Sequence, residues 1–199
     1  MRQQNTQIAL KKQLGYTIDQ TILIVSVIAI LVTMIIGSVG WDLLSRAGGT
    51  KLQSHLTQME QAAGSFFAQY GLWPTDVTGP PTGPSTDAMK ALIDPNTSFT
   101  NGFDPDEDEF RNYLNSYSID GSTVKHPFGA GGDVSIEPKT ENGQTTLVFE
   151  LTNVPTREFN NADEGIDGKL DTDKGRIRTD DDPDTTDSVT LQYYANVIR

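Results

Sequence analysis

One long apolar run near the start of the chain constrains the fold more than any other feature. The run covers residues 18–39, and its only strongly polar positions are Asp19 and Gln20 near its start. An α-helix rises about 1.5 Å per residue, so about 20 such residues cross a hydrocarbon core of about 30 Å. The sequence therefore predicts a helix able to span a membrane, followed by a polar remainder.

The remainder of the chain is acidic. The formal net charge is −12, and Arg2, Lys11 and Lys12 precede the apolar run. Phosphate binding needs clustered Lys and Arg, so this balance disfavours nucleic acid as a direct partner. Basic residues before the span and few just after it predict a cytoplasmic N-terminus and an exported head. The 199 residues include no cysteine, so no disulfide stabilises that head.

Three interpretations of the apolar run are open: a secretory signal peptide, a plain single-pass anchor, and a helix retained after cleavage on its cytoplasmic side. The run is longer than the about 7–15 residues usual in a signal peptide, and no A-x-A-like site follows it. Gly15 follows two lysines closely and precedes Tyr16, which makes it a possible cleavage site. Cleavage there would keep the whole apolar helix in the mature protein.

Residues 12–20, KQLGYTIDQ, resemble the class III signal of type IV pilins and pseudopilins. The resemblance implies that residues 1–15 form a leader, which a prepilin peptidase removes after Gly15, and that Tyr16 is then N-methylated. Residues 16–40 would be the hydrophobic helix, which lies in the membrane first and in the filament core later.

One position departs from the family pattern. A glutamate usually stands five residues after the glycine, whereas here that residue is Gln20 and the acid, Asp19, comes one residue earlier. In the family this acid is thought to meet the N-terminal amine of a neighbouring subunit, so the resemblance implies that Asp19 and Gln20 act in assembly. The alternative for Asp19 is a carboxylate at a helix N-terminus, where the helix dipole favours it.

The helix is predicted to continue as an amphipathic segment through residues 41–74. Its apolar residues recur mostly at spacings of three, four and seven, which gives one buried stripe. Gly71 and Pro74 favour its end, and Gly48 and Gly49 weaken it locally and suggest a bend. The stripe consists of Leu43, Leu44, Ala47, Leu52, Leu56, Met59, Ala63, Phe66, Phe67 and Tyr70.

Residues 75–199 predict a globular αβ head. Short helices are expected at residues 86–93, capped by Thr86 or Asp87, and at residues 109–117. Strands are expected at residues 133–138, 145–152 and 188–198, with Asn142-Gly143 as a hairpin turn. Three or four antiparallel strands need a cover, and the apolar stripe of the helix supplies it. The expected fold class is therefore α+β, with a long N-terminal helix packed on a small antiparallel sheet, similar to the pilin fold.

Residues 160–187 are rich in Asp and Gly and are predicted to form an acidic loop. Flexible loops with many oxygen atoms suit Ca²⁺, although the spacing here is not that of an EF-hand. Similar calcium-bound loops occur in some pseudopilins. The alternative is a solvated acidic loop that nearby Lys and Arg partly neutralise. The candidate ligands are Asp163, Asp167, Asp171 and Asp173.

The sequence predicts that the chain is not an enzyme. It has no cysteine nucleophile, P-loop, H-E-x-x-H or G-x-S-x-G motif. The two histidines, His55 and His126, are far apart, one on the predicted helix and one at a predicted turn.

The resemblance implies a structural subunit of a type IV pilus or pilus-like filament, with a type IVb-like pilin favoured. Its partners would be identical or homologous pilin subunits, the prepilin peptidase, an inner-membrane assembly platform and, before assembly, membrane lipid. It would reside in the bacterial inner membrane with its head periplasmic or external, and then in an extracellular pilus or a periplasmic pseudopilus. The alternatives are a pseudopilin of a type II secretion system, a minor pilin, and a membrane-anchored calcium-dependent binding module.

Overall fold

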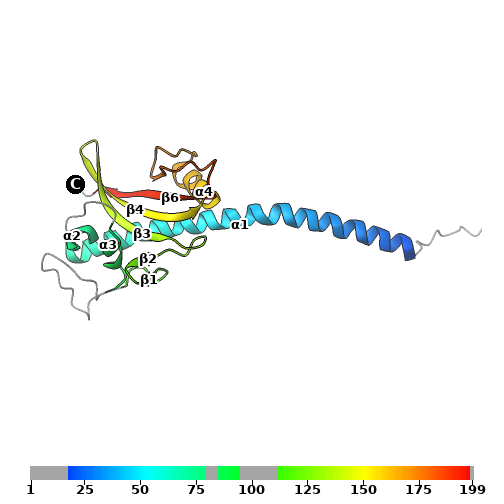
Figure 1. Ribbon diagram of the computed structural model, residues 1–199, viewed down its shortest axis with the longest axis horizontal. Helices are drawn as coiled ribbons and strands as arrows, with labels where there is room; N and C mark the ends of the chain where they lie inside the picture. Colours follow the sequence, from blue (N-terminus) through cyan, green and yellow to red (C-terminus); the bar gives the residue numbers. More distant parts are fainter. Residues whose placement is uncertain (1–17, 79–84, 95–111, 198–199) are drawn as a thin grey trace, which may run out of the picture. The chain divides into compact units, whose positions relative to one another are not determined.

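The computed structural model describes residues 18–78, 85–94 and 112–197. Its long N-terminal helix is followed by short helices and an antiparallel sheet, which confirms the α+β class (Figure 1). The elements are α1 (Ile18–Tyr70), α2 (Pro74–Val77), α3 (Thr86–Lys90), β1 (Ser118–Asp120), β2 (Thr123–Lys125), β3 (Asp133–Glu141), β4 (Gln144–Pro155), α4 (Thr156–Asp167), β5 (Ile177–Arg178) and β6 (Ser188–Val197).

The chain divides into two compact units, Met1–Asp42 and Leu43–Arg199. Helix α1 contributes residues to both. In the first unit, Ile18–Gly37 is a 20-residue stretch long and apolar enough to cross a membrane, and none of it is buried within the protein. Such a segment suggests a membrane anchor or a signal sequence.

The second unit, which we call the head, contains a six-stranded antiparallel sheet with the strand order β1-β2-β3-β4-β6-β5. The prediction of three or four strands was therefore too low, because β1, β2 and β5 have only two or three residues each and give almost no periodic signal. The longest pairing joins β3 to β4 from Val134↔Leu151 to Glu141↔Gln144. Asn142 and Gly143, with φ of 52° and 80°, form the predicted hairpin turn.

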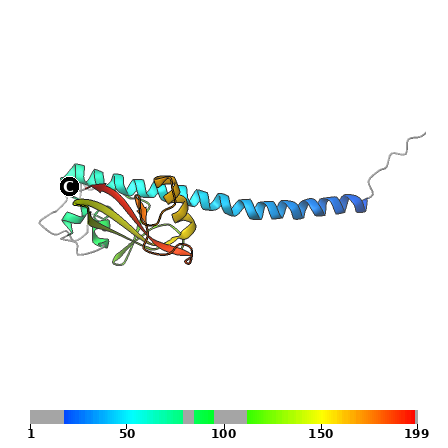
Figure 2. The same ribbon diagram turned by 90° about the horizontal axis from the view of Figure 1, so that it is seen from above.

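The later half of α1 covers one face of this sheet, as the apolar stripe predicts (Figure 2). Phe66 is fully buried, but its neighbour Phe67 is 41% exposed and stacks on Trp73 with 4.5 Å between ring centroids. Successive residues of a helix point about 100° apart, so only one of the two rings faces the sheet. Ala47 is also exposed, and the side chains of Leu43 and Leu44 lie outside those described. The fully buried stripe residues are Leu52, Leu56, Met59, Ala63 and Phe66.

Gly48 and Gly49 have a packing role that the sequence did not reveal. Helix α1 is continuous through both glycines, and α4 lies directly against them. A Cβ on Gly48 would come within 2.7 Å of the Glu158 Oε1, and one on Gly49 would overlap Asn161. The two glycines therefore permit a close approach of α4, which is a common use of glycine.

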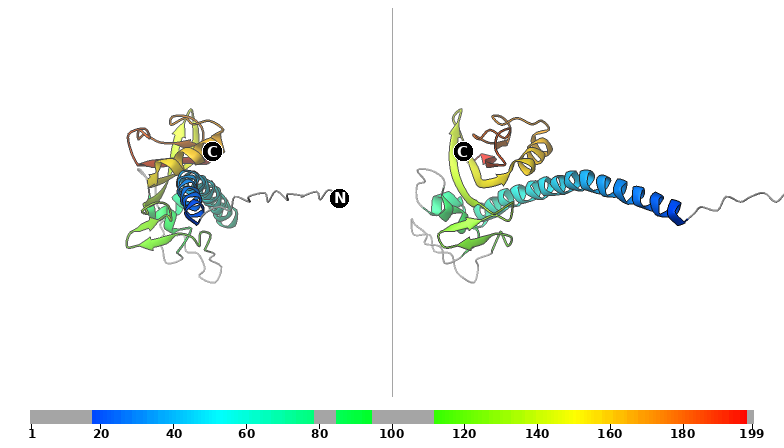
Figure 3. Two further views of the ribbon diagram at one scale, coloured as in Figure 1. Left: turned by 90° about the vertical axis from the view of Figure 1, so that its right-hand side faces the viewer. Right: turned by 45° about the vertical axis from the view of Figure 1, so that its right-hand side comes forward.

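The prediction of a continuous loop over residues 160–187 was wrong. Residues up to Asp167 belong to α4, which ends where Gly168 adopts a φ of 73° and donates its N–H to the Glu164 carbonyl. The helix forms because it can bury Phe159, Ala162 and Asp163 on one face. Strand β5 then interrupts the remaining segment, and it forms the sheet edge opposite to β1 (Figure 3).

The short helices were predicted with mixed success. Helix α3 is present, but its N-cap is Ser85, whose hydroxyl accepts a hydrogen bond from the Ala88 N–H, rather than Thr86 or Asp87. Residues 112–117, the described part of the predicted 109–117 helix, form a bend and a turn instead.

Candidate functional site

Some of the predicted N-terminal functional residues precede Ile18, the first residue that the structure describes, and the others follow it. Gly15 and Tyr16, the predicted cleavage and methylation positions, lie outside the described residues. Asp19 and Gln20 lie in the first turn of α1, and both are exposed. The Asp19 carboxylate is thus placed where the helix dipole favours a negative charge.

The apolar part of α1 exposes large aliphatic side chains around its whole circumference. Each such residue between Ile18 and Ile36 is at least 43% exposed. Two of its hydroxyl groups bond within the helix: Ser26 donates to the Ile22 carbonyl and Thr33 donates to the Ala29 carbonyl, both at 2.8 Å. A contiguous apolar surface of this kind is unusual on a soluble monomer and suggests a membrane anchor or a signal sequence. We take it as the principal candidate functional surface.

Aspartate side chains organise the loop between α4 and β5. The Asp163 Oδ2 accepts a hydrogen bond from the Asp171 N–H at 2.8 Å. The Asp167 Oδ2 accepts from the consecutive N–H groups of Arg176 and Ile177 at 2.8 and 2.9 Å. Three of the predicted calcium ligands therefore lie close together and hold the loop through backbone N–H groups.

The rest of the acidic segment follows the same pattern. Asp173 takes part through its backbone N–H, which donates to the Asp171 Oδ1 at 3.1 Å. Further along, Asp181 accepts from the Thr190 N–H at 2.6 Å. Many of these aspartates thus stabilise turns, as Asp commonly does, and this role accounts for part of the acidic composition without a metal.

Asp163 is the exception. It is fully buried, and its Oδ1 accepts no hydrogen bond from the residues that the structure describes. Burial raises the pKa of its carboxyl to about 6; the bond from Asp171 opposes this rise, and the neighbouring Asp167 adds to it. Among the described residues, no three His, Cys, Asp or Glu side chains are arranged as a metal site. Calcium binding therefore stays a prediction.

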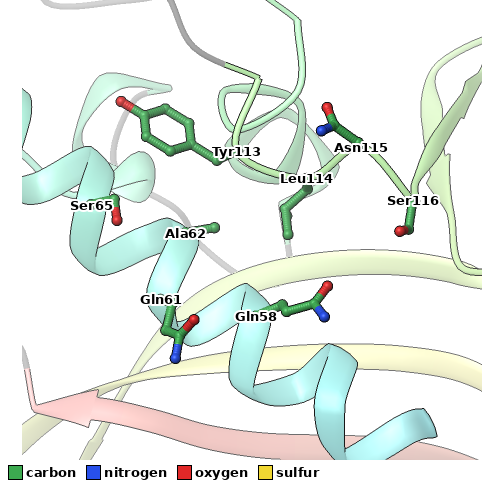
Figure 4. Close-up of a pocket in the computed structure, with 8 residues that line it drawn as sticks. All are labelled: Gln58, Gln61, Ala62, Ser65, Tyr113, Leu114, Asn115 and Ser116. Atoms are coloured by element: carbon green, nitrogen blue, oxygen red, sulfur yellow. The ribbon is translucent and has the colours of Figure 1, made fainter.

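A third feature is a groove of about 390 Å³ between α1 and residues 113–116 (Figure 4). Its lining contains amides and hydroxyls that can hydrogen-bond a polar molecule, but it includes no charged or imidazole group that could act as a general base. The lining residues are Gln58, Gln61, Ala62, Ser65, Tyr113, Leu114, Asn115 and Ser116.

The chain matches no protein-family model, no curated protein and no solved structure. The order of elements, an apolar N-terminal helix followed by an antiparallel sheet, is consistent with a pilin-like fold.

The structure also brings together residues that the sequence analysis treated separately. Arg176 pairs with Glu60 on α1, and the Tyr193 hydroxyl donates to the same Glu60 carboxylate at 2.6 Å. This network ties the acidic segment to α1 and to β6. Its partners are up to 133 residues apart, so no local pattern could have indicated it.

The two histidines, predicted to be far apart, both contact the ring of Phe128. The His55 and His126 ring centroids lie 5.0 and 5.6 Å from that of Phe128. The His-Pro-Phe-Gly turn at residues 126–129 could have indicated this cluster. An aromatic side chain in such a turn is either buried in the core or exposed, and burial would place it next to His126.

Proposed function

We propose that this chain is a structural subunit of a type IV pilus or pilus-like filament, assembled through its N-terminal apolar helix. One observation carries the proposal: Ile18–Gly37 exposes aliphatic side chains on all sides, while later residues of the same helix form the core of a folded head. A subunit of this kind can exchange lipid for neighbouring helices without any change in its head.

The chemistry of the apolar segment suits both environments. Every backbone polar group inside a helix is satisfied internally, which hydrocarbon requires. Between helices in such surroundings, association depends on van der Waals packing of aliphatic and small side chains. The hydroxyls of Ser26 and Thr33 already bond within α1, so they impose no penalty in lipid or in a bundle of helices.

In this proposal a prepilin peptidase removes residues 1–15, and Tyr16 becomes the methylated N-terminus. The chain resides in the inner membrane with its head outside the cytoplasm until an assembly platform extracts it. A pseudopilin of a type II secretion system or a minor pilin would use the same helix in the same way, and these remain the alternatives within the family.

The N-terminus of the mature protein tests processing. Mass spectrometry of protein isolated from the native cell is expected to show a chain that starts at Tyr16 and carries one added methyl group. A Gly15→Val variant should keep its leader and form no filaments. A mature product that retains Met1, or that begins after Val39, would contradict the proposal.

Engineered cysteines test assembly separately, because the natural sequence contains none. An Ile24→Cys variant should form disulfide-linked dimers in isolated filaments, since neighbouring apolar helices pack together in the proposed assembly. Thr57→Cys, on the exposed side of α1 in the head, reports whether contacts extend beyond the apolar segment. Monomeric Ile24→Cys protein after oxidation would indicate a plain membrane anchor.

We propose further that the loop between α4 and β5 binds Ca²⁺. The supporting observation is the buried Oδ1 of Asp163, which has no donor among the described residues and lies beside Asp167 and Asp171. Calcium takes six to eight oxygen ligands, so carbonyl groups and water would have to complete the site. Asp173 is the fourth candidate ligand.

Thermal unfolding with calcium and with chelator tests this site. A ligand that binds only the folded state raises the midpoint, so calcium should stabilise the wild-type chain and leave Asp163→Asn unaffected. An equal concentration of magnesium controls for ionic strength. If calcium does not shift the wild-type midpoint, the loop is a solvated acidic segment.

A further inference from the structure

Phe128 lies at the turn between β2 and β3, where it meets both histidines of the sequence. His55 comes from α1, and its ring stands at 87° to the Phe128 ring. His126 belongs to the turn itself. The three rings, which we call the histidine latch, therefore join the helix to the sheet at one place.

His126 is held in its neutral form by both of its ring nitrogens. Its Nδ1 accepts a hydrogen bond from the Phe128 N–H at 3.1 Å. Its Nε2 lies 2.6 Å from the Thr152 carbonyl oxygen, which can only accept, so Nε2 carries the proton. A second proton on Nδ1 would face the Phe128 N–H directly and break the turn.

Among the residues that the structure describes, no hydrogen-bond partner lies at the Nδ1 of His55. The residue is 7% exposed, and this nitrogen is buried. The neighbouring Tyr117 ring packs edge-on against it at 5.8 Å. A protonated ring would bury a charged donor at Nδ1 with no acceptor among the described residues, which is costly.

The charged groups around His55 also favour the neutral form. Lys51 lies one turn earlier on α1, with its Nζ 5.8 Å from the Phe128 ring centroid. Burial lowers the pKa of His55, and Lys51 lowers it further. Glu158 on α4 faces Lys51 and interacts with that cation. Tyr117 is the other titratable group at this site, and burial raises its pKa.

Charges of both signs lie near His126. Lys125 on β2 and Asp133 on β3 form an ion pair at 2.6 Å. Burial lowers the pKa of His126, the bond to Thr152 and the Asp133 charge raise it, and Lys125 lowers it, with a net decrease. The protonation state of His126 therefore depends mainly on burial and on its two hydrogen bonds.

We propose that the histidine latch makes the contact between α1 and the β2–β3 turn acid-sensitive, closed when both imidazoles are neutral and open when they are protonated. The sign follows from linkage: the unfolded chain takes up protons near pH 6.5, whereas the folded head takes them up only at lower pH. The stabilisation is complete above about pH 6.5 and is lost as the pH falls. Each pKa unit of difference at each histidine changes the folding equilibrium about tenfold.

A histidine-free variant tests the proposal, because the sequence contains only two histidines. In His55→Phe/His126→Asn, the Phe keeps an aromatic ring against Phe128, and the Asn side chain can accept from the N–H two residues later. Urea unfolding of the full chain in detergent micelles would be compared at about pH 7.5 and about pH 5. We expect the wild-type midpoint to fall on acidification, and that of the variant to stay constant or rise. Equal shifts in both proteins would overturn the proposal.

Two measurements on the wild-type chain keep the test decisive if the variant fails to fold. In a proton NMR titration both imidazoles should titrate below the unperturbed value of about 6.5; midpoints at or above that value would overturn the proposal. Hydrogen exchange, corrected for the pH dependence of the intrinsic rates, locates the opening. At low pH, peptides covering residues 50–60 and 124–134 should lose protection before those of β4 and β6, and uniform loss would contradict a local latch.

Discussion

The two parts of helix α1 contrast sharply in what surrounds them. Residues from Ile18 to Gly37 are apolar on every side and exposed, whereas residues from Leu52 to Phe66 are apolar along one stripe only, and that stripe is fully buried against the sheet. Both parts are helical, so secondary structure does not distinguish them. The distribution of apolar residues around the axis does, because it decides whether the helix needs one covering face or a complete apolar environment.

The contrast also separates two kinds of stability. The later part of α1 is stabilised within one chain, because its buried stripe belongs to the same core as residues of β3, β4 and β6. None of Ile18–Gly37 is buried within the described part of the chain, and in the proposed assembly lipid or other chains cover it. Substitutions in the later part of α1 should therefore change the stability of the head, whereas those in the apolar part should change membrane insertion or assembly. Four predictions test this difference.

The largest effect is expected in the buried stripe. Phe66→Ala should lower the free energy of unfolding of the head by about 3–5 kcal/mol, because it removes a fully buried aromatic ring and leaves a cavity. Phe67→Ala is the matched control, since its ring is 41% exposed and stacks on Trp73, and it should cost far less. Urea titration of the full chain in detergent measures both. Equal costs would show that the two rings share the core.

A charged side chain in the apolar part of α1 should weaken membrane insertion. Ile28→Lys is expected to cost about 2.5–3.5 kcal/mol of membrane insertion near the centre of the span, while the urea midpoint of the head stays unchanged. Ile28→Leu is the control. Flotation of membranes from expressing cells measures retention, and a head destabilised by Ile28→Lys would contradict the separation of the two parts.

Two glycines of α1 should respond to alanine in opposite directions. A Cβ on Gly49 would overlap Asn161 of α4, whereas one on Gly64 meets no atom within 4 Å. Gly49→Ala should destabilise the head by about 1–3 kcal/mol through overpacking, and Gly64→Ala should stabilise it by up to about 1 kcal/mol through helix propensity. Thermal unfolding decides the signs. Stabilisation by both variants would mean that α4 moves aside at little cost.

The smallest effect on the helix itself is expected at Asp19. Asp19→Asn removes a carboxylate from the first turn of α1, which is worth about 0.3–1 kcal/mol, and membrane retention should not change. Filament number, counted by electron microscopy, is nevertheless expected to fall, because the proposed assembly pairs this charge with a neighbouring subunit. Wild-type filament numbers would leave Asp19 as a helix-terminal carboxylate alone.

Much of the fold could be predicted because its signals are local. The apolar run, the period of the stripe, the Asn142-Gly143 turn and the main strands each depend on residues a few positions apart. The short strands β1, β2 and β5 were missed because two or three residues carry no usable period. Helix α4 was missed because its acidic and amide residues resemble a loop, and burial of Phe159 and Ala162 makes it a helix.

The candidate functional residues were likewise predictable only in part. Asp163, Asp167 and Asp171 were predicted from composition, and the structure places them together, but it also shows that one oxygen of each already accepts from a backbone N–H group. The function of Gly48 and Gly49 depends on α4, more than a hundred residues later.

The division of α1 into an apolar part and an amphipathic part follows from the amino-acid sequence alone, because hydrophobicity and helical period are properties of neighbouring residues. Three features depend on tertiary contacts: which acids act as backbone acceptors, why two glycines stand where α4 packs against α1, and the meeting of both histidines at Phe128. Those contacts join residues brought together by burial of a common core, and burial depends on the whole chain rather than on any one segment.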